Sequence, residues 1–174
     1  MKAASFEAIV RALNEAGVRY IVVGGVAVNA HGYGRATYDV DLVIHLAAEN
    51  VIRAFAALES IAYHPQIPVR AEQFADAALR ASWRDDKGMI VLKMWSDRHR
   101  ETPIDIFVTE PFDFEAEYAA VHRQELESGC HAPILQLETL LAMKRGAGRP
   151  KDLADIDELH LLYGKPSSYD REQP

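Results

Sequence analysis

The chain has 174 residues, a formal net charge of −7, 49% hydrophobic residues and a single cysteine, Cys130. This length suits one domain with a sizeable core, and the acidic balance argues against general adhesion to nucleic acid or anionic membranes. One cysteine excludes an internal disulfide framework and fits a reducing compartment. The N-terminus lacks the long apolar core of a signal peptide, so we expect a cytoplasmic protein.

The first predicted elements are a helix over 5–16 and a strand over 19–23, and the strand ends at a glycine pair, Gly24 and Gly25. A short helix is expected to start at Val26. Glycine tolerates positive φ and lets a ligand approach the backbone, and the start of a helix attracts anions. The glycine pair therefore predicts a contact with a phosphate group, and a tight turn without a ligand is the alternative.

A turn-rich link over 32–35 leads into a second predicted strand, which carries Asp39 and Asp41. Side chains alternate along a strand, so these two carboxylates should lie on the same face, roughly 7 Å apart along the backbone. Carboxylate oxygens are the ligands that hard cations prefer. Together with the glycine pair, this strand predicts a site for a metal-bound nucleotide, and a solvated edge strand is the alternative.

Two further side chains near this strand are candidate nucleotide ligands. The guanidinium of Arg35 suits a phosphate oxygen, although a plain surface arginine is the alternative. Thr37 shares the strand face of Asp39 and is expected to line the pocket.

The middle of the chain predicts helices over 48–60 and 71–81 and strands over 89–95 and 104–108, the last two joined as a hairpin. Asp105 lies within the final strand of this set. A buried carboxylate needs a partner, and a metal ion would be one. A structural salt bridge is the alternative.

The last part of the chain predicts helices over 112–121, 135–145 and 150–163. The pattern over 124–129 does not decide its structure, and a strand is one candidate. Lys144 is expected near a triphosphate or an acceptor, or else on a solvated helix end. Four acidic residues of the final helix are interpreted as a solvated, salt-bridged face: Asp152, Asp155, Asp157 and Glu158.

The order of these motifs resembles the nucleotidyltransferase superfamily, which has the polymerase beta-like fold. Gly24-Gly25 is followed, after thirteen residues, by Asp39-Val40-Asp41-Leu42. The string AVNAHGYGRATYDVDLVI is most similar to the small prokaryotic minimal nucleotidyltransferases, which include members of abortive-infection toxin–antitoxin pairs. The string LLAMKRGAGRPKDLADIDEL also resembles their C-terminal helical segment.

The resemblance implies an α/β (α+β) fold, with a small, mixed, twisted sheet flanked by helices and a short helical C-terminus. It implies a single nucleotidyltransferase-like domain over 1–164, with a core over about 17–110 and a helical part over about 111–164. Residues 165–174 are expected to form a flexible tail.

The resemblance also implies transfer of a nucleoside monophosphate from an NTP such as ATP to an acceptor hydroxyl, with release of pyrophosphate and dependence on two Mg²⁺ ions. It assigns catalysis and metal binding to Asp39, Asp41 and Asp105. It assigns nucleotide binding to Gly24, Gly25, Arg35, Thr37 and Lys144.

The alternative function is a catalytically weak or inactive binding module of the same fold, which acts with a partner protein as a toxin–antitoxin component. A hydrolase that uses the same carboxylates would usually need further His or Asp ligands at close spacing, so it is disfavoured. No membrane partner is expected. The acceptor, which could be a small molecule, a tRNA or a protein, stays open, as do the base preference and the oligomeric state.

Overall fold

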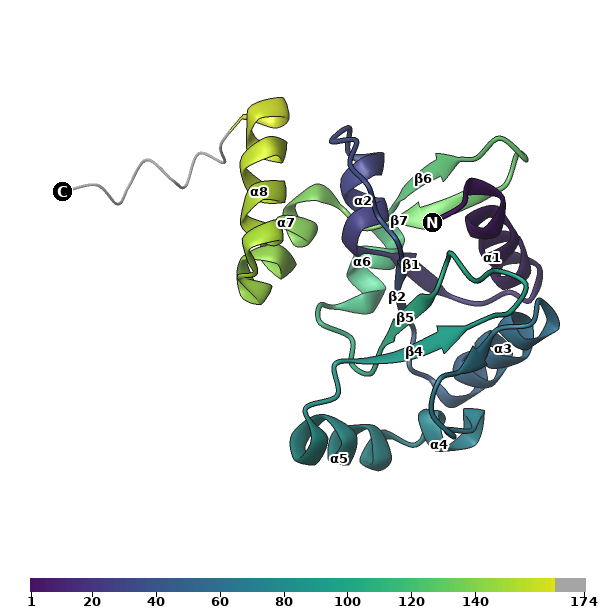
Figure 1. Ribbon diagram of the computed structural model, residues 1–174. Coiled ribbons are helices and arrows are strands. Elements are labelled where there is room, and N and C mark those ends of the chain that lie inside the picture. Colours follow the sequence, from purple (N-terminus) through teal and green to yellow (C-terminus); the bar gives the residue numbers. More distant parts are fainter. Residues whose placement is uncertain (165–174) are drawn as a thin grey trace.

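A seven-stranded mixed sheet organises the chain, with strand order β3-β4-β5-β2-β1-β7-β6. The computed structural model describes residues 1–164 (Figure 1), and the predicted flexible tail over 165–174 lies outside them. The strands are β1 (Tyr20–Val22), β2 (Val40–Ile44), β3 (His64–Pro65), β4 (Val91–Trp95), β5 (Ile104–Phe107), β6 (His122–Glu125) and β7 (His131–Ile134).

Helices flank this sheet and close the C-terminal end of the described chain. They are α1 (Ala3–Glu15), α2 (Gly24–Ala30), α3 (Ala48–Ser60), α4 (Ala71–Ala75), α5 (Ala77–Lys87), α6 (Phe114–Ala120), α7 (Leu137–Ala147) and α8 (Pro150–Tyr163). The predicted fold class, a mixed α/β sheet with a helical C-terminus, is confirmed. Within residues 1–164, no helix has both the length and the apolar character needed to cross a bilayer.

Strand β2 lies inside the sheet, antiparallel to β1 and parallel to β5. Strand β4 pairs antiparallel with β5, which confirms the predicted hairpin. The predicted strand near 124–129 is found slightly earlier, as β6, and its antiparallel partner β7 was not predicted. Because β1, β2 and β5 are interior strands, their apolar residues lie in the core.

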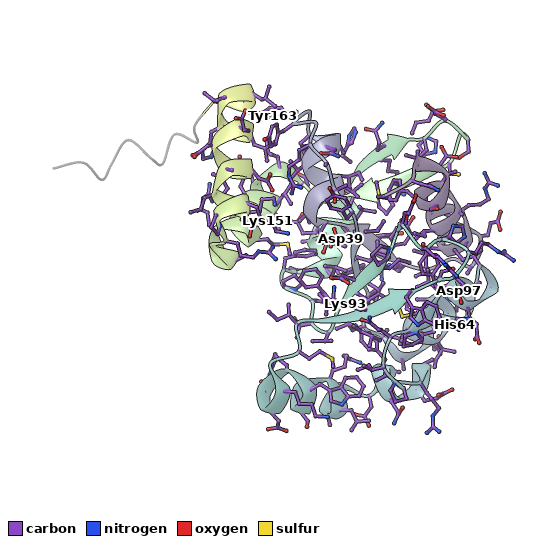
Figure 2. All side chains as sticks on the ribbon, in the orientation of Figure 1. Asp39, His64, Lys93, Asp97, Lys151 and Tyr163 are labelled. Atoms are coloured by element: carbon purple, nitrogen blue, oxygen red, sulfur yellow. The ribbon has the colours of Figure 1, made fainter. Side chains whose placement is uncertain are left out.

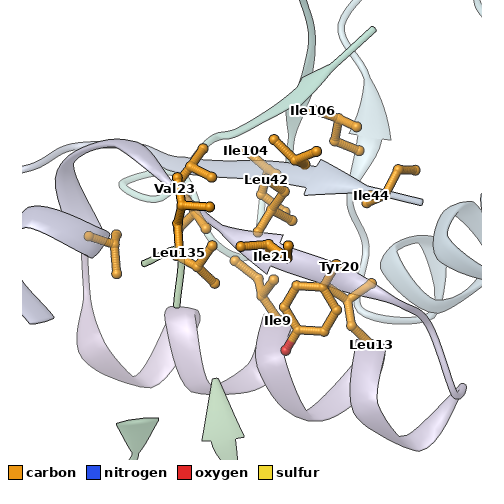
Figure 3. Packing of buried hydrophobic residues seen from close by; sticks show 14 of the residues in the cluster. Ile9, Leu13, Tyr20, Ile21, Val23, Leu42, Ile44, Ile104, Ile106 and Leu135 are labelled. Atoms are coloured by element: carbon orange, nitrogen blue, oxygen red, sulfur yellow. The ribbon is translucent and has the colours of Figure 1, made fainter. Parts of the chain in front are cut away.

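The core forms where α1 packs on the sheet. Ile9 and Leu13 of α1 are fully buried against Tyr20 and Ile21 of β1 (Figure 3). Apolar burial of this kind is the main stabilising contribution in a domain of this size. It gives the interior strands a rigid support, on which the polar side chains at their ends are positioned.

Several predicted helices begin or end differently from the expectation, including the helix over 71–81 and the short helix after the glycine pair. The predicted helix over 71–81 is divided into α4 and α5, because the carboxylate of Asp76 accepts hydrogen bonds from the amides of Ala78 and Leu79 and caps α5. Helix α2 starts at Gly24, two residues before the predicted start.

Helices α7 and α8 lie side by side next to α2 (Figure 1). Helix α2 also contacts β2, so it lies between the sheet and the C-terminal helices. This arrangement brings the start of α8 close to the end of the sheet where β2 begins. The candidate site lies between them.

Candidate functional site

Three charged side chains form one row across neighbouring strands. Lys93 of β4 is the register partner of Asp105 of β5, and Asp105 is the register partner of Asp41 of β2. Register partners on neighbouring strands present their side chains on the same face. The Lys93 ammonium lies 3.0 Å and 3.1 Å from the two carboxylate oxygens of Asp105.

The glycine pair is explained by the side chains that lie against it. Gly24 has φ +62°, and a Cβ at this position would overlap the carboxylate of Asp41. A Cβ on Gly25 would lie 2.5 Å from the hydroxyl oxygen of Thr37. Both glycines are therefore needed for the close approach of Asp41 and Thr37 to the first turn of α2. The phosphate contact of the glycines stays a prediction.

Asp41 carries negative charge that the described side chains only partly balance. Burial, together with the negative charges of Asp39 and Asp105, raises its pKa to about 6. A hydrogen bond from the Gly25 amide and the positive charge of Lys151 oppose this rise in pKa without cancelling it. The site therefore favours a cation.

A pocket of about 400 Å³ opens over Asp41 and Asp105 of this row. Its sheet side carries the predicted carboxylates, and its helix side carries Arg149 and Lys151 from the start of α8. Figure 2 shows Asp39 beside the sheet and Lys151 on α8. All of the predicted site residues line this one pocket: Gly24, Gly25, Arg35, Thr37, Asp39, Asp41, Asp105 and Lys144.

The remainder of the pocket is apolar apart from Asp152 of α8. Ile90 contributes from the position before β4, Val91 from β4 and Phe107 from β5. Helix α7 contributes Leu140, Met143 and Ala147. The pocket thus combines an acidic wall, a basic edge and an apolar end.

A buried ion network holds α8 against the rest of the site. The guanidinium of Arg35 binds both carboxylate oxygens of Asp155, at 2.5 Å and 2.8 Å. The Lys144 ammonium lies 2.6 Å from Asp155 and 3.2 Å from Asp152. Arg149 completes the network at 2.5 Å from Asp152.

The interpretation of Asp152 and Asp155 as a solvated face is wrong, although their salt bridges were expected. Each is only 1% exposed, because α8 turns this face towards α7 and the link before β2. Burial alone would raise both pKa values. Asp152 accepts hydrogen bonds from Arg149 and Lys144, and these lower its pKa in spite of burial. Asp155 accepts hydrogen bonds from Arg35 and Lys144, which lower its pKa in the same way.

Arg35 and Lys144 therefore reach the pocket with their charges already paired. Arg35 is also held by α2, since the Asn29 side chain exchanges hydrogen bonds with its backbone at 2.9 Å and 3.1 Å. Arg149 is also paired, with Asp152, but its side chain is 61% exposed, and Lys151 is exposed. The charges most accessible to a ligand on the helix side are those of Arg149 and Lys151.

The sequence interpretation missed Lys93 as the partner of Asp105. A lysine in the middle of a predicted strand was the available signal, but the hairpin register was needed to place it opposite Asp105. Within residues 1–164, no three His, Cys, Asp or Glu side chains are gathered closely enough to form a metal site. The roles of Asp39, Asp41 and Asp105 as metal ligands stay a prediction.

Comparison with known proteins shows similarity in structure only, since no family model and no curated protein sequence matches the chain. LnuA, a lincosamide antibiotic adenylyltransferase with bound lincomycin, is 15% identical with a TM-score of 0.61, over 91% of this chain and 96% of that one. The antibiotic-resistance factor ANT(2'')-Ia, in complex with adenylyl-2''-tobramycin, is 12% identical with a TM-score of 0.57, over 93% of this chain and 89% of that one. A protein of Thermotoga maritima assigned as a nucleotidyltransferase is 13% identical with a TM-score of 0.57, over 93% and 92% of the two chains.

The chain therefore has the nucleotidyltransferase fold. The resemblance seen in the sequence is confirmed at the level of the fold. The similarity to toxin–antitoxin members of the superfamily stays a prediction.

Replacing Asp41 with Asn should stabilise the metal-free protein at high pH. The folded-state pKa of Asp41 lies above its usual value, so the wild-type protein loses stability as the pH rises from about 4 towards 6. A tenfold change in proton affinity is worth about 1.4 kcal/mol, so the gain in Asp41→Asn should be on the order of 2–3 kcal/mol at pH 8 and vanish near pH 4. Urea unfolding with a chelator measures this gain, and Asp97→Asn is an exposed control.

Replacing Asp155 with Asn should destabilise the protein at pH 7. The substitution removes the partner of Arg35 and one partner of Lys144, and breaking a buried ion pair costs about 3–5 kcal/mol. Because the pKa of Asp155 is lowered on folding, its contribution should be present at neutral pH and lost as the pH falls below about 4. Urea unfolding of Asp155→Asn against the exposed Asp157→Asn tests this, and equal stabilities would contradict it.

Proposed function

We propose that this protein is a metal-dependent nucleotidyltransferase, which transfers a nucleoside monophosphate from an NTP to an acceptor hydroxyl. The observation that carries the proposal is the charge pattern of one pocket, with three carboxylates on the sheet side and two exposed cations on the helix side. A nucleotide triphosphate with a bound metal ion has the complementary charges.

The carboxylates fit a divalent cation. Burial first, and then the negative charges of Asp39 and Asp105, raise the pKa of Asp41, and Asp39 lies beside it in the same pocket. Asp39 and Asp41 would hold Mg²⁺ through oxygen ligands, which this ion prefers. When bound, the ion would supply neutralisation of the phosphate charge and a lowered pKa for the acceptor hydroxyl.

The cations of α8 would bind the triphosphate. Arg149 and Lys151 line the pocket and are exposed, so they can contact phosphate oxygens directly. Arg35 and Lys144 would complete this positive edge. Since both are also paired with Asp155, they would hold α8 at the distance that the triphosphate needs.

The remaining predicted residues would position the reacting groups. The backbone at Gly24 and the hydroxyl of Thr37 would contact the phosphates. The Gly25 amide already donates to Asp41 and would hold that carboxylate in place. The apolar end would take the nucleobase or an apolar part of the acceptor.

In the transfer step, the acceptor oxygen forms a bond to the α-phosphorus and the bond to the bridging oxygen of pyrophosphate breaks. Asp105 is the carboxylate in the row that can take the hydroxyl proton, because it lies next to Asp41 and faces the pocket. Catalysis of this kind depends mainly on positioning and on charge stabilisation.

The solved relatives support ATP as the nucleotide and a small molecule as the acceptor. LnuA is an adenylyltransferase seen with lincomycin, and ANT(2'')-Ia is seen with adenylylated tobramycin. An antibiotic or a similar hydroxyl-bearing small molecule is therefore the first acceptor class to test for this chain.

The second candidate function is a binding module that acts with a partner protein, such as one component of a toxin–antitoxin pair. The ion pair of Lys93 with Asp105 favours it, because this carboxylate is already neutralised. In that case the pocket would bind a nucleotide without transferring it.

The proposal predicts Mg²⁺-dependent NTP binding that is lost in Asp39→Ala/Asp41→Ala. Removing both carboxylates leaves only Asp105, which is paired with Lys93, on the sheet side. Affinity should therefore fall by about a hundredfold or more, since loss of a hydrogen-bond partner of a metal ligand alone costs about 10–100-fold. Calorimetric titration of each NTP with and without Mg²⁺ measures this. The matched control is Asp97→Ala/Asp157→Ala, which removes the same charge outside the pocket.

Transfer itself is tested with α-labelled NTP and candidate acceptors. Labelled acceptor made by the wild-type protein, and not by the Asp39→Ala/Asp41→Ala variant, would support the enzyme. Nucleotide binding without labelling of any acceptor would favour the binding module. Absence of NTP binding would overturn the enzyme and favour a module that acts through its partner protein alone.

A further inference from the structure

Lys93 has a fixed place next to the proposed cation site. Its backbone lies inside the sheet, between β5, where Asp105 is its register partner, and the segment after β3, where the Gln66 amide donates to its carbonyl at 2.8 Å. Figure 2 shows Lys93 on β4. Because both sides of this backbone are hydrogen-bonded, the ammonium is carried by a rigid element.

The ammonium of Lys93 neutralises a carboxylate that has little other contact with solvent. Asp105 is 8% exposed, and Lys93 contacts both of its oxygens at 3.0 Å and 3.1 Å. No other ion pair to Asp105 is found within residues 1–164. Losing Lys93 would leave Asp105 beside Asp41 with two negative charges and no resident cation, which disfavours both.

A second metal ion at Asp105 would have to share this carboxylate with the ammonium. Two cations at one carboxylate repel each other, and this repulsion acts on the buried Asp105 side, since the Asp105 side chain is 11% exposed and that of Lys93 is 56% exposed. Lysine presents a compact point charge on a flexible stem, so it can occupy the space in which a second ion would lie.

We propose that Lys93 replaces the second metal ion at Asp105, so that the site binds one divalent cation, at Asp39 and Asp41. This inference rests on the proposed function. It makes Lys93 a positioning residue, which holds both oxygens of Asp105 and keeps this carboxylate outside the metal coordination.

Counting bound Mn²⁺ by electron paramagnetic resonance, with a non-hydrolysable NTP analogue present, tests the inference without measuring activity. The wild-type protein should bind one Mn²⁺ per chain. Lys93→Met should bind two, the second at least tenfold more tightly than any second ion on the wild-type protein. Lys93→Arg keeps the charge and should bind one.

Two further variants make the result specific. Lys93→Met/Asp105→Asn should return to one ion, because the gained ion needs the Asp105 carboxylate. Lys87→Met removes an exposed lysine of α5 and should match the wild-type protein. Circular dichroism checks that each variant is folded, and the Lys93→Met/Asp105→Asn variant removes the unpaired buried charge of the single variant.

Two ions on the wild-type protein, or one ion on Lys93→Met, would overturn the inference and leave the proposed function standing. A wild-type protein that binds neither Mn²⁺ nor the NTP analogue would instead overturn the proposed function, and this inference with it.

Discussion

The parallel pairing of β2 with β5 is the constraint on which the candidate site depends. It places Asp41 opposite Asp105, two residues far apart in the chain, on one face of the sheet. Since β2 is also paired with β1, the chain leaving β1 passes directly under Asp41, and only glycine at position 24 leaves room for that carboxylate. Backbone hydrogen bonds therefore bring the acidic side chains together, against the repulsion between their charges.

Opposite charges on neighbouring elements make this arrangement tolerable. On the sheet, Lys93 balances Asp105. On the helical side, two buried carboxylates of α8 are matched by cations from three different segments, so that α8 is held against α7 and the link before β2. The charge that stays only partly matched is that of Asp41 and Asp39, which is where a bound cation would complete the balance. The charged side chains that hold the elements together are therefore next to those that the proposed function uses.

Much of the fold and the outline of the site follow from local patterns. The strand that precedes Gly24 and the helices over 48–60 and 150–163 were placed well, because apolar periodicity reports which face of an element is covered. All of the predicted site residues line one pocket, although they come from separate segments of the chain. The helix over 71–81 was misjudged because Asp76 caps a new helix inside it, and periodicity does not register a cap of this kind.

The sequence by itself determined which residues can form strands and helices and that Asp105 needs a partner. It predicted Asp39 and Asp41 on one strand, whereas Asp39 lies just before β2 and only Asp41 lies within it. Only the tertiary structure decided that this partner is Lys93 and that Asp155 is buried rather than solvated. The physical reason is range. Alternation and helical spacing depend on neighbouring residues, whereas strand register and the covering of a helix face depend on elements that meet only in the folded chain.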